Sequence, residues 1–425
     1  MSEHPILETR EKAIGRRAAL LFVFCMMLGW VGVMAGDWYF RFARYSWHRG
    51  LITYPVGRPA QEDQALPLFR TNQVPARVGG DLSNLAGFRG FAERFEQERP
   101  AYLRVVDRYG YQNRPYDPET APDIVVVGDS FMAVGSTDSQ FSSKLADRSE
   151  LFVYNHAVMG HGPFRSVYRF IDSPRFQDQP PKLLVWGFAE REIGGHAFAG
   201  MVYQLNRRKQ WQSEVTADED PLSFNRPRFF WGGLSPHRLQ GSLPDSSFLA
   251  QVGEWLWNRV RYYLFRQVSP HVVVSAVPVE NDPILFFRYH IDMLARERDP
   301  YRMYQVAWGF ETLRDFLNDR GIPLLVVLIP EKEQVYRHAV PPHFDVPDEE
   351  AKPSVLRKVE ADLLELGIPV VNLLGPFHDV AQRGKLIYWR DDTHWNVRGR
   401  EIAVDKTWRE IRRHFPELAQ EAENE

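Results

Sequence analysis

Residues at two distant points of the chain could together activate an alcohol. Ser130 ends the run Gly128-Asp129-Ser130, and His394 is preceded by two acids, Asp391 and Asp392. A serine hydroxyl is a weak nucleophile until a base takes its proton, and histidine is the usual base because its pKa lies near neutrality. An acid on the other imidazole nitrogen selects the tautomer and stabilises the protonated ring. These residues therefore indicate nucleophilic catalysis, with either aspartate as the acid.

The segments before Ser130 and His394 predict how the fold brings the two residues together. The short run at 124–127 is apolar and mostly β-branched, which indicates a buried strand, and Gly128 turns the chain out of it. Similar runs, separated by helix-like segments, recur at 151–154, 183–187, 322–330 and 368–373. This alternation predicts a parallel sheet with right-handed crossovers. Because parallel strands end at one edge of a sheet, we expect Ser130 and His394 to meet there.

The two blocks resemble those of a known family. Gly128-Asp129-Ser130 is similar to the nucleophile block of the SGNH (GDSL-type) hydrolases, and the run from Asp392 to Asn396 (Asp-Thr-His-Trp-Asn) is similar to their acid–histidine block. With this Asp-Thr-His-Trp variant, the chain resembles the periplasmic polysaccharide O-acetyltransferases of the alginate-acetylation type. The resemblance implies an α/β fold, a flavodoxin-like three-layer sandwich around a mainly parallel sheet. The D-x-H spacing of that branch favours Asp392 as the acid, and the D-x-x-H spacing of the broader family leaves Asp391 as the alternate.

The same resemblance suggests donors for the oxyanion that forms during acyl transfer. A developing oxyanion needs hydrogen-bond donors aimed at it. In the family these include a glycine of the second block, which Gly160 matches, and an asparagine of the third block. Here the third block reads Phe-Ala-Glu-Arg-Glu over 188–192 and contains no asparagine. Either Arg191 takes that role or the oxyanion hole is weaker, which favours the acetyltransferase branch over a fast hydrolase.

Five further residues are predicted to contact the substrate. Aromatic rings stack on sugars, so three tryptophans are candidate walls of a groove: Trp186, Trp389 and Trp395. Lys332 and Tyr336 match a Pro-x-Lys-x-x-x-Tyr turn of the acetyltransferase-like family, and a solvated turn is the alternative. Neither an H-E-x-x-H motif nor a cysteine pair nor a phosphate-binding glycine loop occurs, so no metal and no cofactor are expected.

The N-terminus predicts a membrane anchor. Ala18–Gly36 contains no charged side chain, and basic residues at positions 10, 12, 16 and 17 precede it, which favours a cytoplasmic N-terminus and an exported body. The alternative is a cleaved signal peptide that ends near Ala35. The aromatic residues at 30 and 38–40 favour an uncleaved, single-pass helix in the inner membrane, with the catalytic domain in the periplasm.

Composition and the alternation of predicted strands and helices divide the chain into segments. We predict a cytoplasmic tail and anchor over 1–44, a proline-broken linker and approach segment over 45–120, an SGNH-like α/β domain over 121–415 and a frayed acidic tail over 416–425. A large insertion over about 196–300 interrupts the strand–helix rhythm. It is either a surface insertion or a lid, and its segment 248–268 could pack on its own domain or lie against a membrane or partner.

Composition narrows the partners and the function. The net charge of -3 over 425 residues leaves no basic footprint for nucleic acid, and the single cysteine, Cys25, excludes an intrachain disulfide. The first hypothesis is an O-acetyltransferase with a polysaccharide acceptor and, as the resemblance implies, a membrane-bound O-acyltransferase partner. The second is a carbohydrate acetyl esterase with the same triad. The third is a non-catalytic scaffold that binds glycan or a membrane partner.

Overall fold

The computed structural model describes most of the chain from residue 105 onward and parts of what precedes it. The described residues are 20–36, 80–86, 95, 98, 105–159, 162–214, 256–257, 260, 263–264, 268–295, 300–344, 346–347, 350 and 352–424. The chain forms two compact units, one of residues 1–56 and 227–260 and the other of residues 57–226 and 261–425. The second unit contains every element discussed from here on, except the helix at 20–36.

Five parallel strands form the central sheet, as the sequence predicts. They are β1 (Ile124–Val127), β2 (Val153–Asn155), β3 (Leu183–Ala189), β6 (Leu324–Ile329) and β7 (Val370–Asn372), in the order β2-β1-β3-β6-β7. β-Branched and other apolar residues favour such strands because both faces of a parallel sheet are covered. The order reverses between β1 and β3, which is the point where doubly wound sheets of this order bind ligands. The α/β class expected from the sequence is confirmed.

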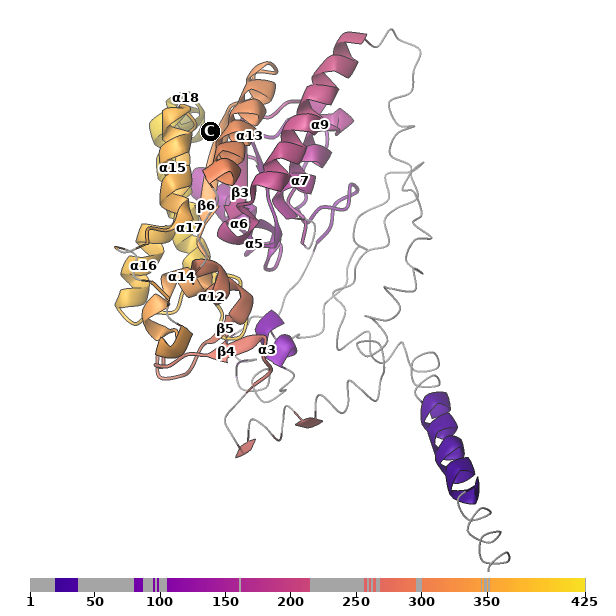
Figure 1. The fold of residues 1–425 in the computed structure, drawn as a ribbon. Helices are drawn as coiled ribbons and strands as arrows, with labels where there is room; N and C mark the ends of the chain where they lie inside the picture. Colours follow the sequence, from indigo (N-terminus) through magenta and orange to yellow (C-terminus); the bar gives the residue numbers. More distant parts are fainter. Residues whose placement is uncertain are drawn as a thin grey trace, which may run out of the picture. The chain divides into compact units, whose positions relative to one another are not determined.

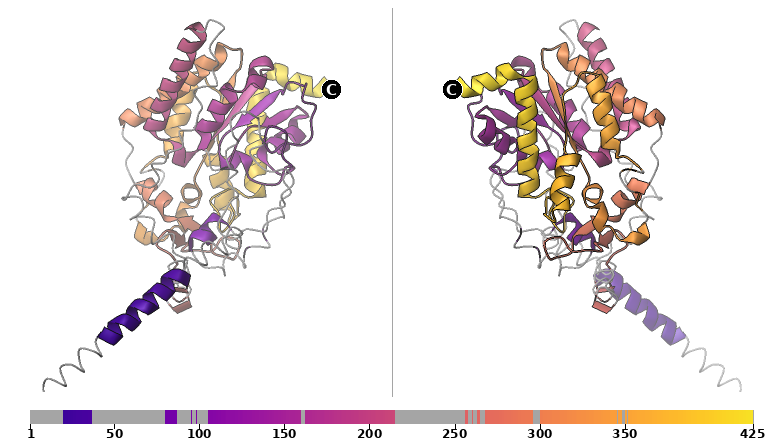
Figure 2. Two further views of the ribbon diagram at one scale, coloured as in Figure 1. Left: turned by 90° about the vertical axis from the view of Figure 1, so that its right-hand side faces the viewer. Right: turned by 90° about the vertical axis from the view of Figure 1, so that its left-hand side faces the viewer.

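Helices cover both faces of the sheet (Figures 1 and 2). Along β1, Val125 and Val127 face one hydrophobic cluster and Ile124 and Val126 face the other, as the two-residue period of a strand requires. The first face is covered by α7 (Gly162–Ile171), α8 (Pro174–Asp178), α9 (Gly195–Glu214), α13 (Pro300–Asn318) and α15 (Val355–Glu365). The second is covered by α5 (Ser130–Ala133), α6 (Phe141–Ser149), α16 (Leu374–Gln382) and α17 (Val397–His414).

A group of smaller elements lies beyond the carboxyl ends of the strands. It comprises α3 (Asp81–Ala86), the antiparallel hairpin β4 (Val272–Val274) and β5 (Leu285–Phe287), α12 (Arg288–Ala295) and α14 (Lys332–Val335). Of these, α3 falls in the predicted linker, and the hairpin and α12 fall in the predicted insertion. Both regions therefore contribute ordered structure beside the end of the sheet that carries Ser130.

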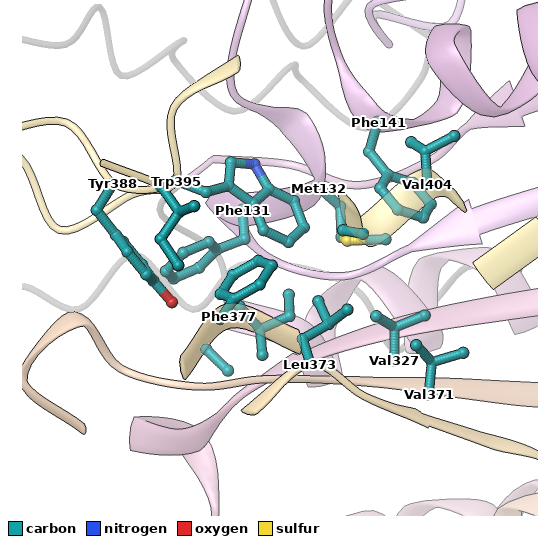
Figure 3. Close-up of a cluster of buried hydrophobic side chains, with 14 of the residues drawn as sticks. Phe131, Met132, Phe141, Val327, Val371, Leu373, Phe377, Tyr388, Trp395 and Val404 are labelled. Atoms are coloured by element: carbon teal, nitrogen blue, oxygen red, sulfur yellow. The ribbon is translucent and has the colours of Figure 1, made fainter. Parts of the chain in front are cut away.

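The close-up in Figure 3 shows a cluster of buried side chains that includes Phe131, the neighbour of Ser130 in the chain. The ring of Phe131 packs edge-on against Trp395 with centroids 5.4 Å apart, and Trp395 lies 6.1 Å from the ring of Phe141. Phe377 and Tyr388 extend the cluster, with centroids 5.8 Å apart. Such aromatic pairs bury large areas in fixed geometry. The segments that carry Ser130 and His394 thus share one rigid core.

Two predictions concern the ends of the chain. Residues 20–36 are helical, but among the described residues no helix combines the length and apolarity needed to cross a bilayer, so the transmembrane helix predicted over Ala18–Gly36 is not found. The acidic tail is not frayed either: α18 covers Pro416–Asn424, and Leu418 and Ala419 are buried. Two buried apolar positions tie this helix to the domain.

A glycine at the start of α17 gives a stability prediction. A β-carbon on Gly399 would overlap the Ile387 carbonyl oxygen and lie 3.0 Å from the β-carbon of Trp395. Because a backbone carbonyl yields less easily than a side chain, Gly399→Ala should lower the free energy of unfolding by about 1–3 kcal/mol in urea titrations. Gly375→Ala in α16 is the control, since nothing lies within 4 Å there, and it should be neutral or stabilising by up to about 1 kcal/mol. Equal effects at both sites would contradict the packing argument.

Candidate active site

Ser130 stands at the carboxyl end of β1, where the strand turns sharply into α5. Gly128 has φ +154°, and a β-carbon there would lie 2.6 Å from Met132 Cγ and 2.9 Å from the Gly187 carbonyl oxygen, so only glycine fits. Asp129 is the N-cap of α5 and accepts a hydrogen bond from the Phe131 amide at 2.9 Å. Turn and cap together hold Ser130 as the first residue of a short helix.

His394 lies opposite Ser130 although 264 positions separate them in the chain. Ser130 Oγ is 2.7 Å from His394 Nε2, and His394 Nδ1 is 2.6 Å from Asp392 Oδ1. Since a carboxylate only accepts, Asp392 favours the proton on Nδ1 and leaves Nε2 to accept from the serine hydroxyl. The Asp392 carboxylate also accepts from the His394 amide at 2.9 Å, which fixes the turn between the two residues. The structure brings three predicted site residues into one hydrogen-bonded chain.

The surroundings of His394 shift its proton affinity. Burial disfavours the charged imidazole, but the adjacent Asp392 carboxylate outweighs burial, and the pKa of His394 is raised above the ordinary value of 6.5. A protonated His394 cannot take a proton from Ser130. We therefore expect kcat/KM for acyl transfer to fall on the acidic side with a midpoint above pH 6.5, measured as a pH–rate profile of ester cleavage. A midpoint at or below 6.5 would contradict this assignment.

Asp391, the alternate acid, has a different position. Its Oδ2 accepts from the Gly80 amide at 2.9 Å and from the Ser83 hydroxyl at 2.6 Å, and its carbonyl oxygen accepts from the Ser83 amide at 3.2 Å. The carboxylate therefore caps the first turn of α3, while Asp392 contacts the imidazole. Adjacent residues of the same type thus have separate tasks.

A second carboxylate, that of Asp81, also lies near the His394 imidazole, and it was not predicted from the sequence. Asp81 Oδ2 lies 3.9 Å from His394 Nδ1, and the same side chain accepts from the Thr393 amide at 2.8 Å and the Thr393 hydroxyl at 2.5 Å. Burial and the charge of Asp392 raise the pKa of Asp81. Asp81 sits in the segment predicted as a linker, and the only local signal there was an acidic residue at the start of the short helical run Asp81–Ala86.

Lys332 and Tyr336 support the segment before His394 instead of facing a substrate. Lys332 Nζ donates to the carbonyl oxygens of Trp389 at 2.7 Å, Arg390 at 2.8 Å and Asp392 at 3.2 Å, and its side chain is fully buried. Burial lowers the pKa of Lys332 to about 8. Tyr336 is also buried; its hydroxyl donates to the Lys385 carbonyl oxygen at 2.8 Å. Both the substrate-contact prediction and the solvated-turn alternative are therefore corrected, because the two side chains are buried and bonded to backbone.

Removing the Lys332 ammonium distinguishes support of the backbone from contact with a substrate. Lys332→Met removes this donor from three buried carbonyl groups. The Arg390 and Trp389 carbonyl oxygens keep a backbone donor, the amides of Leu285 and Asp392. The free energy of unfolding should therefore fall by about 1–3 kcal/mol in urea titrations, the cost of one unsatisfied buried group. Lys358→Met is the control: this lysine is 61% exposed and pairs with Asp362 at i+4 on the same helix, so the change should be below about 1 kcal/mol. A rise in KM with unchanged stability would instead restore the substrate-binding interpretation.

The three tryptophans do not form an open sugar platform. Trp186 is fully buried in β3 and packs against Phe188 and Phe310, with centroids 5.2 and 5.3 Å away, and Trp395 is fully buried in the core beside Phe131. Trp389 is only 6% exposed. The predicted groove walls are corrected, because burying large rings in the core outweighs leaving them at a surface.

Of the two predicted oxyanion donors, Gly160 lies outside the described residues and Arg191 is placed. Arg191 follows β3 in the one-turn helix η2 (Glu190–Glu192), and its Cζ lies 5.0 Å from the ring centroid of Phe131, the residue after the nucleophile. Its Nε is 3.2 Å from Glu331 Oε1. Burial opposes the guanidinium charge, but Glu331 and Asp129 outweigh it and raise the pKa of Arg191. A permanent cation thus stands one ring away from the imidazole.

In two groups of carboxylate and histidine side chains among the described residues, the ligand atoms lie close enough together to hold a cation. One is Asp81, Asp392 and His394, and the other is His290, Glu331 and Glu333. In the first, the 2.6 Å distance from His394 Nδ1 to Asp392 Oδ1 is that of a direct hydrogen bond. The expectation that the protein takes no metal remains a prediction for experiment.

Comparison with known proteins shows which family this sequence resembles. The chain matches the family model described as "SGNH hydrolase-like domain, acetyltransferase AlgX" over residues 58–190 and 285–425. Three similar curated proteins are named "Probable alginate O-acetylase AlgJ". They come from Pseudomonas syringae pv. tomato (26% identical over 40% of this chain and 41% of the relative), Pseudomonas fluorescens (27%, 38% and 38%) and Pseudomonas aeruginosa (26%, 42% and 43%).

The share of each chain that the matches cover decides what can be concluded from them. The alignments span about two fifths of the length of these curated relatives, so what their names say applies to them. The family model covers more than half of this chain and includes β1, β3 and the segment of His394. The two stretches that it matches carry Ser130 and His394. The chain therefore belongs to the family of SGNH hydrolase-like domains of the acetyltransferase AlgX type.

Proposed function

We propose that this chain is an extracytoplasmic O-acetyltransferase that modifies an exopolysaccharide or a cell-envelope glycan through Ser130. The observation that carries the proposal is the hydrogen-bonded chain from Ser130 Oγ through His394 to Asp392, with distances of 2.7 and 2.6 Å. Family membership and relatives named probable alginate O-acetylases support the reaction class. The identity of the polymer is left to the acceptor assay described below.

The first half of the reaction acylates the serine. Ser130 Oγ attacks the acyl carbonyl carbon while its proton passes to His394 Nε2, and Asp392 stabilises the imidazolium that results. The tetrahedral intermediate collapses when the bond to the leaving group breaks. His394 then returns the proton to the leaving group, so an acetyl-serine ester and a neutral imidazole remain.

The second half transfers the acetyl group to a sugar. An acceptor hydroxyl gives its proton to His394 Nε2 and attacks the ester carbonyl, and the Ser130 oxygen leaves and takes the proton back. Free serine and an acetylated sugar are the products. The acceptor must be held in position, because water competes for the same ester.

Arg191 is the side chain among the described residues that best suits the oxyanion. Its Nε is engaged by Glu331, so its terminal amino groups are the ones that can donate to a developing oxyanion in the low-dielectric site. The backbone amide that follows Ser130 would be a further donor. In this arrangement the permanently charged guanidinium of Arg191 takes the place of the asparagine in other family members.

The acyl donor and the compartment complete the proposal. Acetyl groups activated in the cytoplasm have to cross the membrane before they reach an exported enzyme, and a membrane-bound O-acyltransferase partner would deliver them. The basic residues at 10–17, followed by the uncharged stretch at 18–36, support export of the rest of the chain. Protease treatment of intact spheroplasts tests the location, since a body outside the membrane is cleaved without lysis.

Transfer and hydrolysis are separated by one assay. The full chain is incubated with 4-nitrophenyl acetate, with and without oligosaccharides from candidate polymers, and products are analysed by mass spectrometry. Acetylated oligosaccharide supports the transferase. Free acetate alone, at equal rates with every acceptor, supports the carbohydrate esterase.

A further inference from the structure

We propose that a buried chain of alternating charges, formed by Glu331, His290 and Glu333, positions Arg191 beside Ser130 and thereby sets how strongly the acyl oxyanion is bound. This inference rests on the proposed function and extends it to residues that touch neither substrate nor Ser130. It assigns a task to the segment at 285–295, at the end of the predicted insertion.

The first link joins Arg191 to Glu331. Glu331 Oε1 accepts from the Arg191 amide and lies close to the Arg191 Nε, each at 3.2 Å, so one carboxylate oxygen holds both the backbone and the side chain of that residue. The Glu331 amide donates to Glu190 Oε2 at 3.2 Å. Because β3 and β6 are parallel neighbours, these residues follow their strands at the same edge of the sheet as Ser130.

The second link joins Glu331 to His290. The other oxygen of Glu331 lies 3.1 Å from His290 Nδ1, and Glu333 Oε2 lies 3.3 Å from the same nitrogen. The remaining oxygen of Glu333 accepts from the Phe287 amide at 2.6 Å. Phe287 ends β5 and His290 lies in the first turn of α12. The hairpin that precedes α12 is therefore joined to Arg191 through two carboxylates and one imidazole.

Burial makes these links strong. His290 and Glu331 are each 3% exposed and Glu333 is fully buried. Burial disfavours a charged imidazole, but Glu331 and Glu333 outweigh it and raise the pKa of His290 to about 10, so the ring is cationic at neutral pH. Glu331 then lies between two cations, Arg191 and His290. A buried carboxylate that loses one of two partners leaves an uncompensated charge, which rearranges its neighbours.

The geometry at Ser130 explains why such rearrangement matters. Arg191 stacks over the ring of Phe131 at 5.0 Å, and that ring lies 4.9 Å from the imidazole of His394. A guanidinium held on one side by Glu331 and on the other by Phe131 has little freedom. A misplacement of about 1 Å in such a group can cost about 10²-fold in rate.

A double-mutant cycle on the full chain tests the proposal. Acetyl release from 4-nitrophenyl acetate is measured for Arg191→Ala, His290→Gln and the double variant. We expect kcat to fall about 10²-fold or more for Arg191→Ala and at least about tenfold for His290→Gln. The double variant should match Arg191→Ala within about twofold, because His290 acts only through Arg191. A double variant that loses a further tenfold would overturn the proposal.

Controls keep a structural defect apart from a positioning effect. His414→Gln makes the same change in a histidine that also pairs with a glutamate, Glu410 at 3.2 Å, but at the end of α17, and kcat should not change. If His290→Gln does not fold, as judged by circular dichroism, Glu333→Gln takes its place in the cycle. That variant keeps the oxygen that accepts from Phe287 and removes one charge.

Two further measurements complete the test. Ser130→Ala is assayed in parallel: if it retains activity the proposed function fails, whereas an inactive Ser130→Ala with an additive cycle overturns only the positioning chain. Metal analysis of the purified protein addresses the spacing of His290, Glu331 and Glu333. One bound divalent cation per chain, lost in His290→Gln, would overturn the proposal because a cation would then join the carboxylates.

Discussion

Ser130→Ala should abolish acetyl transfer, with kcat reduced by about 10⁴-fold or more. The alanine removes the only atom that attacks the acyl carbon, and what remains is the contribution of the oxyanion donors and of binding. The same variant should lose the adduct of one acetyl group that intact-mass spectrometry detects after brief exposure of the wild-type chain to an acetyl ester. In the described part of the chain, Ser130 Oγ makes no hydrogen bond other than the one that its hydroxyl donates to His394 Nε2 at 2.7 Å, so the fold should be unaffected.

The outcome also decides between an enzyme and a scaffold. If the wild-type chain forms no adduct on Ser130 and glycan acetylation in cells is unchanged by Ser130→Ala, the non-catalytic scaffold is correct. A thiol at this position is an informative second variant, because Ser130→Cys keeps a nucleophile of similar shape. An acetyl adduct on the cysteine would locate the acylation at position 130 even when turnover is slow.

Asp392→Asn should lower kcat by about 10⁴-fold without a comparable loss of stability. In the native protein the Asp392 carboxylate oxygen lies 2.6 Å from His394 Nδ1 and accepts a hydrogen bond from it. An asparagine amide at that place would donate to Nδ1 instead, so the ring proton would move to Nε2. The Nε2 atom then faces the Ser130 hydroxyl as a donor and cannot act as a base. Steady-state kinetics and thermal unfolding on the same sample measure both effects.

Asp391→Asn is the matched control one residue away. Asp391 holds Gly80 and Ser83 of the α3 segment, so its replacement should lower the melting temperature by a few degrees and kcat by less than about tenfold. Should Asp391→Asn prove the more damaging variant for kcat, the assignment of the acid would be reversed.

The site depends on support from several distant segments. The stretch from Leu386 to His394 is held by Lys332 Nζ from one side, by α3 through Asp391 from another, and by the hairpin through the Leu285 amide, which donates to the Arg390 carbonyl oxygen at 2.8 Å. Catalytic geometry has to be held within about 0.5 Å, which requires such surrounding contacts. The insertion and the linker are therefore parts of the active site's scaffold.

The fold class, the strands and the pairing of Ser130 with His394 were predictable from the sequence. Runs such as Ile124–Val127 specify buried strands through local residue preferences, and the position of Gly128 specifies the turn. The Asp-Thr-His-Trp block could be matched because its residues are adjacent. The residues that make up such a signal lie within a few positions of one another. They can therefore be recognised without knowing which distant residues they contact in the fold.

What the sequence by itself determined is thus the set of residues proposed for the chemistry and the sheet edge at which they lie. Only the tertiary structure decided which aspartate orients His394, that Lys332 and Trp186 are buried, and that Glu331 joins Arg191 to His290. Each of these depends on contacts between residues far apart in the chain. Asp391 and Asp392 are identical in type and adjacent in sequence, and they differ in role because one faces α3 and the other faces the imidazole.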